Sequence, residues 1–124
     1  MPEGIMVLKW NERSGVELKA QFPEGIAKKV SKETLLHLVN LHAFDEASGV
    51  VGLNSEEVNF ISYYSGSLDN YFIMLVLNLL DNAEDYEEIL KDTAREILNN
   101  IVNKKYKEIL PDLFERVLDL HKDL

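Results

Sequence analysis

The fold is decided by one mostly apolar stretch, Tyr71-Phe72-Ile73-Met74-Leu75-Val76-Leu77-Asn78-Leu79-Leu80. Its large side chains would lie on both faces of a strand, with Ile73, Leu75, Leu77 and Leu79 on one and Phe72, Met74, Val76 and Leu80 on the other. A strand that is apolar on both faces must be covered on both, so we predict a central strand between two layers of helices. The stretch is well short of the roughly 20 residues that a membrane-spanning helix needs.

Two strands are expected near the N-terminus, joined by a turn at residues 11–15 into a β-hairpin. The first strand, around Ile5-Met6-Val7-Leu8, is apolar at successive positions, as expected for a strand covered on both faces. The second, residues 16–22, alternates apolar with polar residues, which is typical of an edge strand or a less covered one.

A helix is expected from Ser31, a good N-cap residue, to about Phe44. At about 100° per residue, one face carries four residues, namely Leu35, Leu38, Val39 and His42. His37, Leu41 and Phe44 gather on nearly the opposite side. An apolar patch is therefore left on the outer side of this helix.

Short strands are expected at residues 50–53 and 58–64, and two helices follow the central strand. The first of these helices begins with a capping box formed by Asp81 and Glu84 and runs to about Asn103. The second, near residues 106–118, contains Pro111, which we expect to kink or restart it. The order β-β-α-β-β-β-α-α predicts one α+β domain over residues 1–124, a three-layer sandwich with a five-stranded, mainly antiparallel sheet.

Composition excludes several classes of function. The chain is 46% hydrophobic and 28% charged, with a formal net charge of −9 and no basic stripe, which argues against nucleic acid as a partner. It has no cysteine, so disulfides, thiolate nucleophiles and Cys-ligated metals are ruled out. No signal peptide is recognisable, and we expect a cytoplasmic protein with at most peripheral, indirect membrane association.

The residues suggest no catalytic chemistry. Neither a phosphate-binding glycine loop nor a nucleophile elbow around Ser62 or Ser65 is present. His37 and His42 are expected on different helix faces and His121 lies near the C-terminus, which disfavours a metal site. Acidic residues near Asp81 are explained by helix capping and the helix dipole. We therefore expect a non-enzyme without cofactor or metal.

Over nearly its whole length the chain resembles a longin domain, a profilin-like module related to roadblock domains. The resemblance rests on the element order and on four stretches, Val7–Trp10, Asn59–Tyr64, Tyr71–Leu77 and Asp85–Leu90. Because no SNARE heptads, second domain or C-terminal anchor are recognisable, we expect the chain to resemble the stand-alone longin proteins of prokaryotes, including archaea that carry eukaryote-like small GTPases. The resemblance implies a platform that forms a homodimer or binds a small Ras-like GTPase.

The outer patch on the first helix points to where such a partner would bind. In longin and roadblock proteins the first long helix and a neighbouring edge strand commonly form the partner surface. Carried over, the resemblance implies a partner-binding set of six residues, namely His37, Leu41, Phe44, Val50, Val51 and Leu53. A different class stays open: profilin-like sensors bind a small ligand or peptide between sheet and helix, which would require a pocket lined by polar groups.

Overall fold

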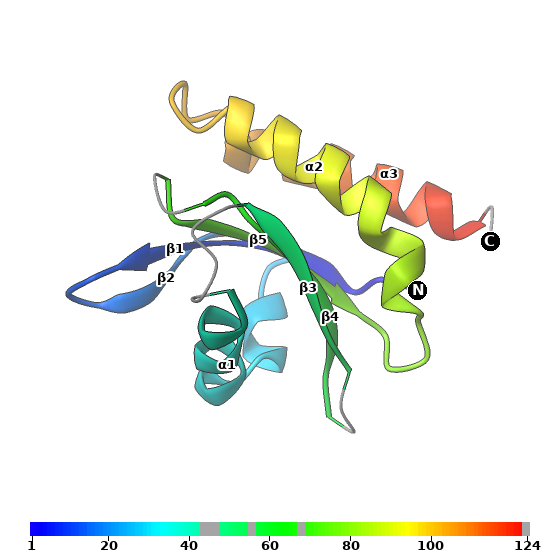
Figure 1. Ribbon diagram of the computed structural model, residues 1–124. Coiled ribbons are helices and arrows are strands. Elements are labelled where there is room, and N and C mark those ends of the chain that lie inside the picture. Colours follow the sequence, from blue (N-terminus) through cyan, green and yellow to red (C-terminus); the bar gives the residue numbers. More distant parts are fainter. Residues whose placement is uncertain (43–47, 55–56, 67–68, 123–124) are drawn as a thin grey trace.

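A five-stranded antiparallel sheet forms the middle of the protein (Figure 1). The computed structural model describes residues 1–42, 48–54, 57–66 and 69–122. The strand order across the sheet is β2-β1-β5-β4-β3. The strands are β1 (Gly4–Asn11), β2 (Gly15–Phe22), β3 (Gly49–Asn54), β4 (Asn59–Tyr64) and β5 (Tyr71–Leu77).

Helices cover both faces of this sheet (Figure 1). One face carries the short 3-10 helix η1 (Ile26–Lys29) and α1 (Lys32–His42). The other carries η2 (Ala83–Tyr86), α2 (Glu87–Asn99) and α3 (Tyr106–Lys122). The predicted α+β three-layer sandwich and its element order are thereby confirmed.

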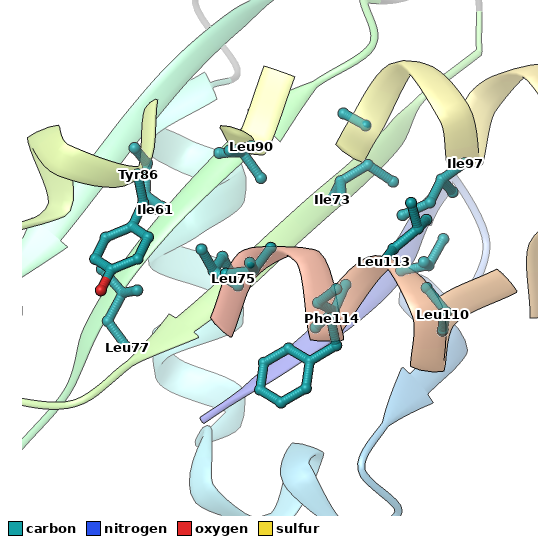
Figure 2. Packing of buried hydrophobic residues seen from close by; sticks show 14 residues of the cluster. Ile61, Ile73, Leu75, Leu77, Tyr86, Leu90, Ile97, Leu110, Leu113 and Phe114 are labelled. Carbon is teal, nitrogen blue, oxygen red and sulfur yellow. The ribbon is translucent and has the colours of Figure 1, made fainter. Parts of the chain in front are cut away.

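Two apolar cores lie on the two sides of β5. Toward α2 and α3, Ile73 and Leu75 pack with residues of both helices, of which Leu90, Ile97, Leu110 and Leu113 are labelled in Figure 2. Toward α1, Phe72 and Met74 pack with Leu38. Residues 72–77 are all at most 3% exposed, so the prediction of a central strand covered on both faces is confirmed.

β5 ends at Leu77, earlier than the sequence predicted. Asn78 begins a tight turn: its backbone N–H donates to Asp81 Oδ2 at 2.9 Å, and its side-chain Oδ1 accepts from the N–H of Leu80 at 3.0 Å. Leu79 and Leu80, expected on the pleat faces, are instead exposed, Leu80 to 95%. A polar residue that hydrogen-bonds its own local backbone has ended the strand.

The next helical segment starts one residue later than expected. Its N-cap is Asn82, whose side chain accepts from the N–H of Glu84 at 3.2 Å, and not Asp81. Asp81 instead holds the preceding turn and pairs with the N-terminal amino group of Met1 at 2.5 Å. α2 ends at Asn99 rather than near Asn103, because the Asn100 side chain donates to the carbonyl of Glu96 and caps the last turn.

Of the two effects predicted for Pro111, a kink or a restart, the restart is wrong, because α3 runs as one helix from Tyr106 to Lys122. The proline lies on the exposed side of the helix. Leu110 and Leu113, on either side of it, are each 1% exposed in the core. Packing of the apolar face on both sides of the proline holds the helix together despite the missing N–H donor.

Gly4 marks a close approach between β1 and η1, which gives a stability prediction. A Cβ at this position would lie 2.5 Å from Ile26 Cγ1 and 2.9 Å from the backbone oxygen of Phe22. We expect Gly4→Ala to lower the free energy of unfolding by about 1–3 kcal/mol through overpacking, measured by urea denaturation. Gly49→Ala is the control, since its Cβ meets nothing within 4 Å, and an equal loss in both variants would contradict this account.

Two buried tyrosines predict an alkaline loss of stability. Burial raises the pKa of Tyr64, and burial together with the Asp81 and Asp85 carboxylates raises the pKa of Tyr86. Because the folded state favours the neutral phenol, stability is constant below the unfolded tyrosine pKa of about 10 and falls as the pH rises above it. We expect Tyr86→Phe to make this fall less steep in urea denaturation and to reduce the late-titrating tyrosinate absorbance, of which Tyr64 supplies the rest. An unchanged titration curve would refute the assignment.

Candidate partner-binding edge

The inner face of α1 is part of the core, as the helical spacing predicted. Leu38 and His42 are buried, and Leu35 and Val39 pack partly buried against the same cluster. The His42 ring lies 5.4 Å from the ring of Phe72, between centroids. His42 is therefore a core residue packed among aromatic rings.

The two flanks of α1 face different edges of the sheet. Lys32, Leu35 and Leu36 line a cleft of about 210 Å³ together with the β1–β2 hairpin, so this flank faces β2. His37 and Leu41 lie on the opposite flank, at helical spacing, and therefore face the β3 side; both are exposed, Leu41 to 40%. Phe44, the third residue predicted for this patch, lies outside the described residues.

β3 supplies the other half of the predicted surface. Val50 packs against the cluster under α2, whereas Leu53 packs against the cluster under α1. Val51, opposite Ser62 of β4, alternates with Val50 and points to the α1 side, where it stays half-buried. The predicted residues Val50, Val51 and Leu53 thus sit on one edge strand, and His37 and Leu41 face the same side of the sheet.

β2, the other edge, carries several features that prevent an added strand from pairing. Lys19 is an extra residue in a bulge, where Ala20 and Leu18 pair with the consecutive residues Val7 and Leu8 of β1. Its Nζ also pairs with Glu17 at 3.2 Å. Bulges, edge lysines and prolines are the common protections of exposed sheet edges, and Pro23 follows the strand directly.

β3 has none of these protections. Its six residues, Gly49-Val50-Val51-Gly52-Leu53-Asn54, include no charge and no proline. They pair with β4 in one continuous register, without a bulge. Such an edge presents unpaired backbone N–H and C=O groups in a regular row, which is a template for another strand.

A small cleft lies beside this edge, on the side of α2. It has a volume of about 250 Å³ and is lined by Tyr63 of β4 and by Lys91, Arg95, Leu98 and Asn99 of α2. Lys91 pairs with Glu87 at 3.5 Å and Arg95 with Asp92 at 3.4 Å, all within the helix and largely exposed. Exposed pairs of this kind contribute roughly 0.2–1 kcal/mol, so these charges exchange partners easily.

Another cleft, of about 610 Å³, opens at the end of the sheet where β5 leaves it. Asn59 is 1% exposed there, and its Nδ2 donates to the carbonyls of Asn78 and Asp81 at 2.9 and 2.8 Å. These bonds hold the loop that follows β5. The cleft is lined by residues at the ends of β4 and β5, by Glu3 and by Lys29, and none of its lining residues comes from α1, α2 or α3.

The described residues offer neither a metal site nor a membrane-spanning helix. Among the described residues, no three His, Cys, Asp or Glu side chains gather as they would around a metal ion. In the same part of the chain, no helix has the length and hydropathy to cross a bilayer. Ser62 is 0% exposed and its Oγ has no hydrogen-bond partner among the described residues, so it is shielded from any substrate.

Comparison of the chain with protein-family models, curated proteins and solved structures gives no match. The candidate site therefore rests on the geometry of the chain itself. The sequence did not predict two features of this site. One is the cleft lined by Lys91 and Arg95, and the other is the bulge that protects β2 from the addition of a strand. The bulge at Lys19 has no signal in the alternation, because Ala20 and Phe22 continue the apolar pattern of Val16 and Leu18.

The exposed fraction of each leucine side chain in α1 predicts how much its substitution lowers the free energy of unfolding. Leu38→Ala, at a 0% exposed position, should cost about 2–5 kcal/mol of unfolding free energy in urea denaturation. Leu41→Lys and Leu36→Lys, on opposite exposed flanks, should each change it by less than about 1 kcal/mol. If Leu41→Lys were as damaging as Leu38→Ala, Leu41 would belong to the core and not to a surface.

Proposed function

We propose that this chain is a non-enzymatic, longin-type protein-interaction module. It would act in the cytoplasm as a dimerising platform for, or a regulator of, a small Ras-like GTPase, of the kind used in membrane trafficking. Its binding surface would comprise the β3 edge and the adjoining flank of α1, with His37, Leu41, Val50, Val51 and Leu53 among the described residues. Phe44 is included from the sequence.

The observation that carries the proposal is the difference between the two edges of the sheet. β2 is bulged and charged, whereas β3 is regular, uncharged and free of proline. A soluble domain that protects one edge and leaves the other open has an edge suited to strand addition. Backbone hydrogen bonds of an added strand supply affinity, and side chains on alternate positions supply specificity.

The exposed residues on α1 fit the same surface. A strand added to β3 would lie beside the α1 flank that carries His37 and Leu41. Exposed Leu41 would then lose contact with water, together with the half-buried Val51. The small Ras-like GTPase as partner comes from the resemblance to longin domains alone, since no catalytic or ligand geometry argues for another class.

The test compares matched lysine substitutions on the two edges. We expect Val51→Lys and Leu41→Lys to weaken partner binding at least tenfold. The partners assayed are a second copy, by light scattering over a concentration series, and purified small Ras-like GTPases of the same organism in GDP-bound and GTP-analogue-bound forms, by interferometry.

Leu18→Lys on β2 and Leu36→Lys on the other flank of α1 are the controls, and both should bind as the wild type does. Equal effects of Val51→Lys and Leu18→Lys would remove the basis for assigning the β3 edge. A wild-type chain that stays monomeric and binds none of the GTPases would reject the proposed function as a whole.

A further inference from the structure

Apart from the β3 edge, we infer that the turn after β5 and the cleft beside it form a second docking surface, which binds a basic amphipathic segment of a partner protein. This turn, residues 78–81, is called the leucine turn because Leu79 and Leu80 on it are exposed. Apolar side chains of the segment would cover these leucines, and its lysine or arginine side chains would face the carboxylates of Glu57 and Asp85.

The two leucines lie at the end of the sheet where β5 leads toward α2 (Figure 1). Leu79 is 48% and Leu80 95% exposed. In the part of the chain that the structure describes, no other two consecutive large apolar residues are both exposed. A single exposed apolar side chain needs no explanation, but apolar side chains grouped beside a cleft are typical of a binding surface.

Hydrogen bonds hold the leucine turn in this exposed conformation. The backbone N–H of Asn78 donates to Asp81 Oδ2, and the N–H of Leu80 donates to Asn78 Oδ1. The buried Asn59 side chain donates to the carbonyls of both Asn78 and Asp81. Because the turn is already formed in the free protein, a partner that binds the leucines does not have to order it.

The cleft of about 610 Å³ beside the turn supplies room for a side chain of the partner. Its lining includes the apolar residues Val58, Val76 and Leu77 next to the two leucines. A small molecule enclosed in this cleft would leave most of the Leu80 side chain in water. An occupant that also covers Leu80 must extend beyond the cleft, as a segment of polypeptide does.

The charges in the cleft favour a basic occupant. Glu57 lines the cleft and is exposed. Of the described residues in the lining, Lys29 is the one cation, and its Nζ is paired with Glu3 at 3.1 Å. The remaining charge in the cleft is therefore acidic, with the same sign as the net charge of −9 of the whole chain.

A further carboxylate lies on the other side of the leucine turn. Asp85 follows the turn in η2 and is exposed. It lies near Asp81 of the turn, because both carboxylates act on the same phenol and raise the pKa of Tyr86. Acidic groups thus stand on both sides of the exposed leucines.

This combination argues for a polypeptide and against a lipid surface. Anionic lipids give the cytoplasmic leaflet a negative surface potential, which attracts lysine and arginine and repels carboxylates. An amphipathic segment with apolar residues on one side and basic residues on the other matches both the leucines and the acids. We therefore commit to such a segment as the occupant.

The test uses a fluorescently labelled peptide of leucine and lysine at helical spacing, titrated with the full chain and followed by anisotropy. We expect Leu80→Ser to weaken binding about tenfold and Glu57→Gln about threefold, through lost apolar contact and lost charge attraction. Val102→Ser is the apolar control, since Val102 is also 95% exposed but lies between α2 and α3. Glu88→Gln, on α2, is the charge control, and both controls should bind as the wild type does.

Several outcomes would overturn the inference. One is a wild-type chain that does not bind the lysine peptide, and another is an equal effect of Leu80→Ser and Val102→Ser. A peptide with glutamate in place of lysine should not bind, and if it binds as tightly, the basic character of the partner is wrong. Binding to phosphatidylserine vesicles that depends on Leu80, without binding to the peptide, would identify a lipid surface instead.

The same variants separate this inference from the proposed function. Leu80→Ser should leave self-association and GTPase binding unchanged, whereas Val51→Lys should leave peptide binding unchanged. If Val51→Lys weakens peptide binding as much as Leu80→Ser does, the peptide binds at the β3 edge and the second surface is wrong. A chain that binds the peptide through Leu80 but neither dimerises nor binds a GTPase would keep this inference and reject the proposed function.

Discussion

β5 is apolar on both of its faces, and the burial of those two faces is the constraint on which the rest of the structure depends. A single layer of helices would leave one row of large side chains in water, at roughly 25 cal/mol for each Å² of apolar surface left exposed. The chain therefore needs α1 on one side and α2 with α3 on the other. With β5 in the middle, β1 and β4 flank it, and β2 and β3 become the edges.

The two edge strands differ in whether they are protected against the addition of another strand. Both lie at the margin of the same sheet and both have an α1 flank nearby. Only β2 is bulged and carries a lysine–glutamate pair, so the chain has one protected and one open margin. Two cationic side chains of α2, Lys91 and Arg95, line a small cleft with Tyr63 of β4, the strand next to the open margin.

The sequence allowed the layers to be predicted because periodicity reports burial directly. Continuous apolar residues in β1 and β5, and helical spacing around Leu38, identified strands and helix faces correctly. Predictions failed where a local polar contact decided the outcome: Asn78 ends β5, and Asn82 rather than Asp81 caps the next helix. The predicted restart at Pro111 failed for the opposite reason, because tertiary packing outweighed a local helix breaker.

Of the candidate site, the sequence identified the outer flank of α1 and the strand that follows, since both are visible as apolar positions outside the main pattern. It could not indicate which edge is open, because the bulge in β2 depends on pairing with β1 and leaves the alternation intact. It also could not place Lys91 and Arg95 beside Tyr63 of β4, because their position follows from the packing of α2 on that strand. Both features depend on contacts between segments that are far apart in the sequence, so the sequence pattern of either segment alone does not show them.

β3 is joined to the sheet by β4 alone, which has a consequence for local opening. A strand with one neighbour can detach by breaking a single ladder, while β1, β5 and both cores stay intact. In the free protein its amide hydrogens should therefore exchange with solvent through this local event rather than through global unfolding. A strand seated on the open margin would suppress that event, so the exchange rate of β3 amides reports directly on how much of the protein has a partner bound.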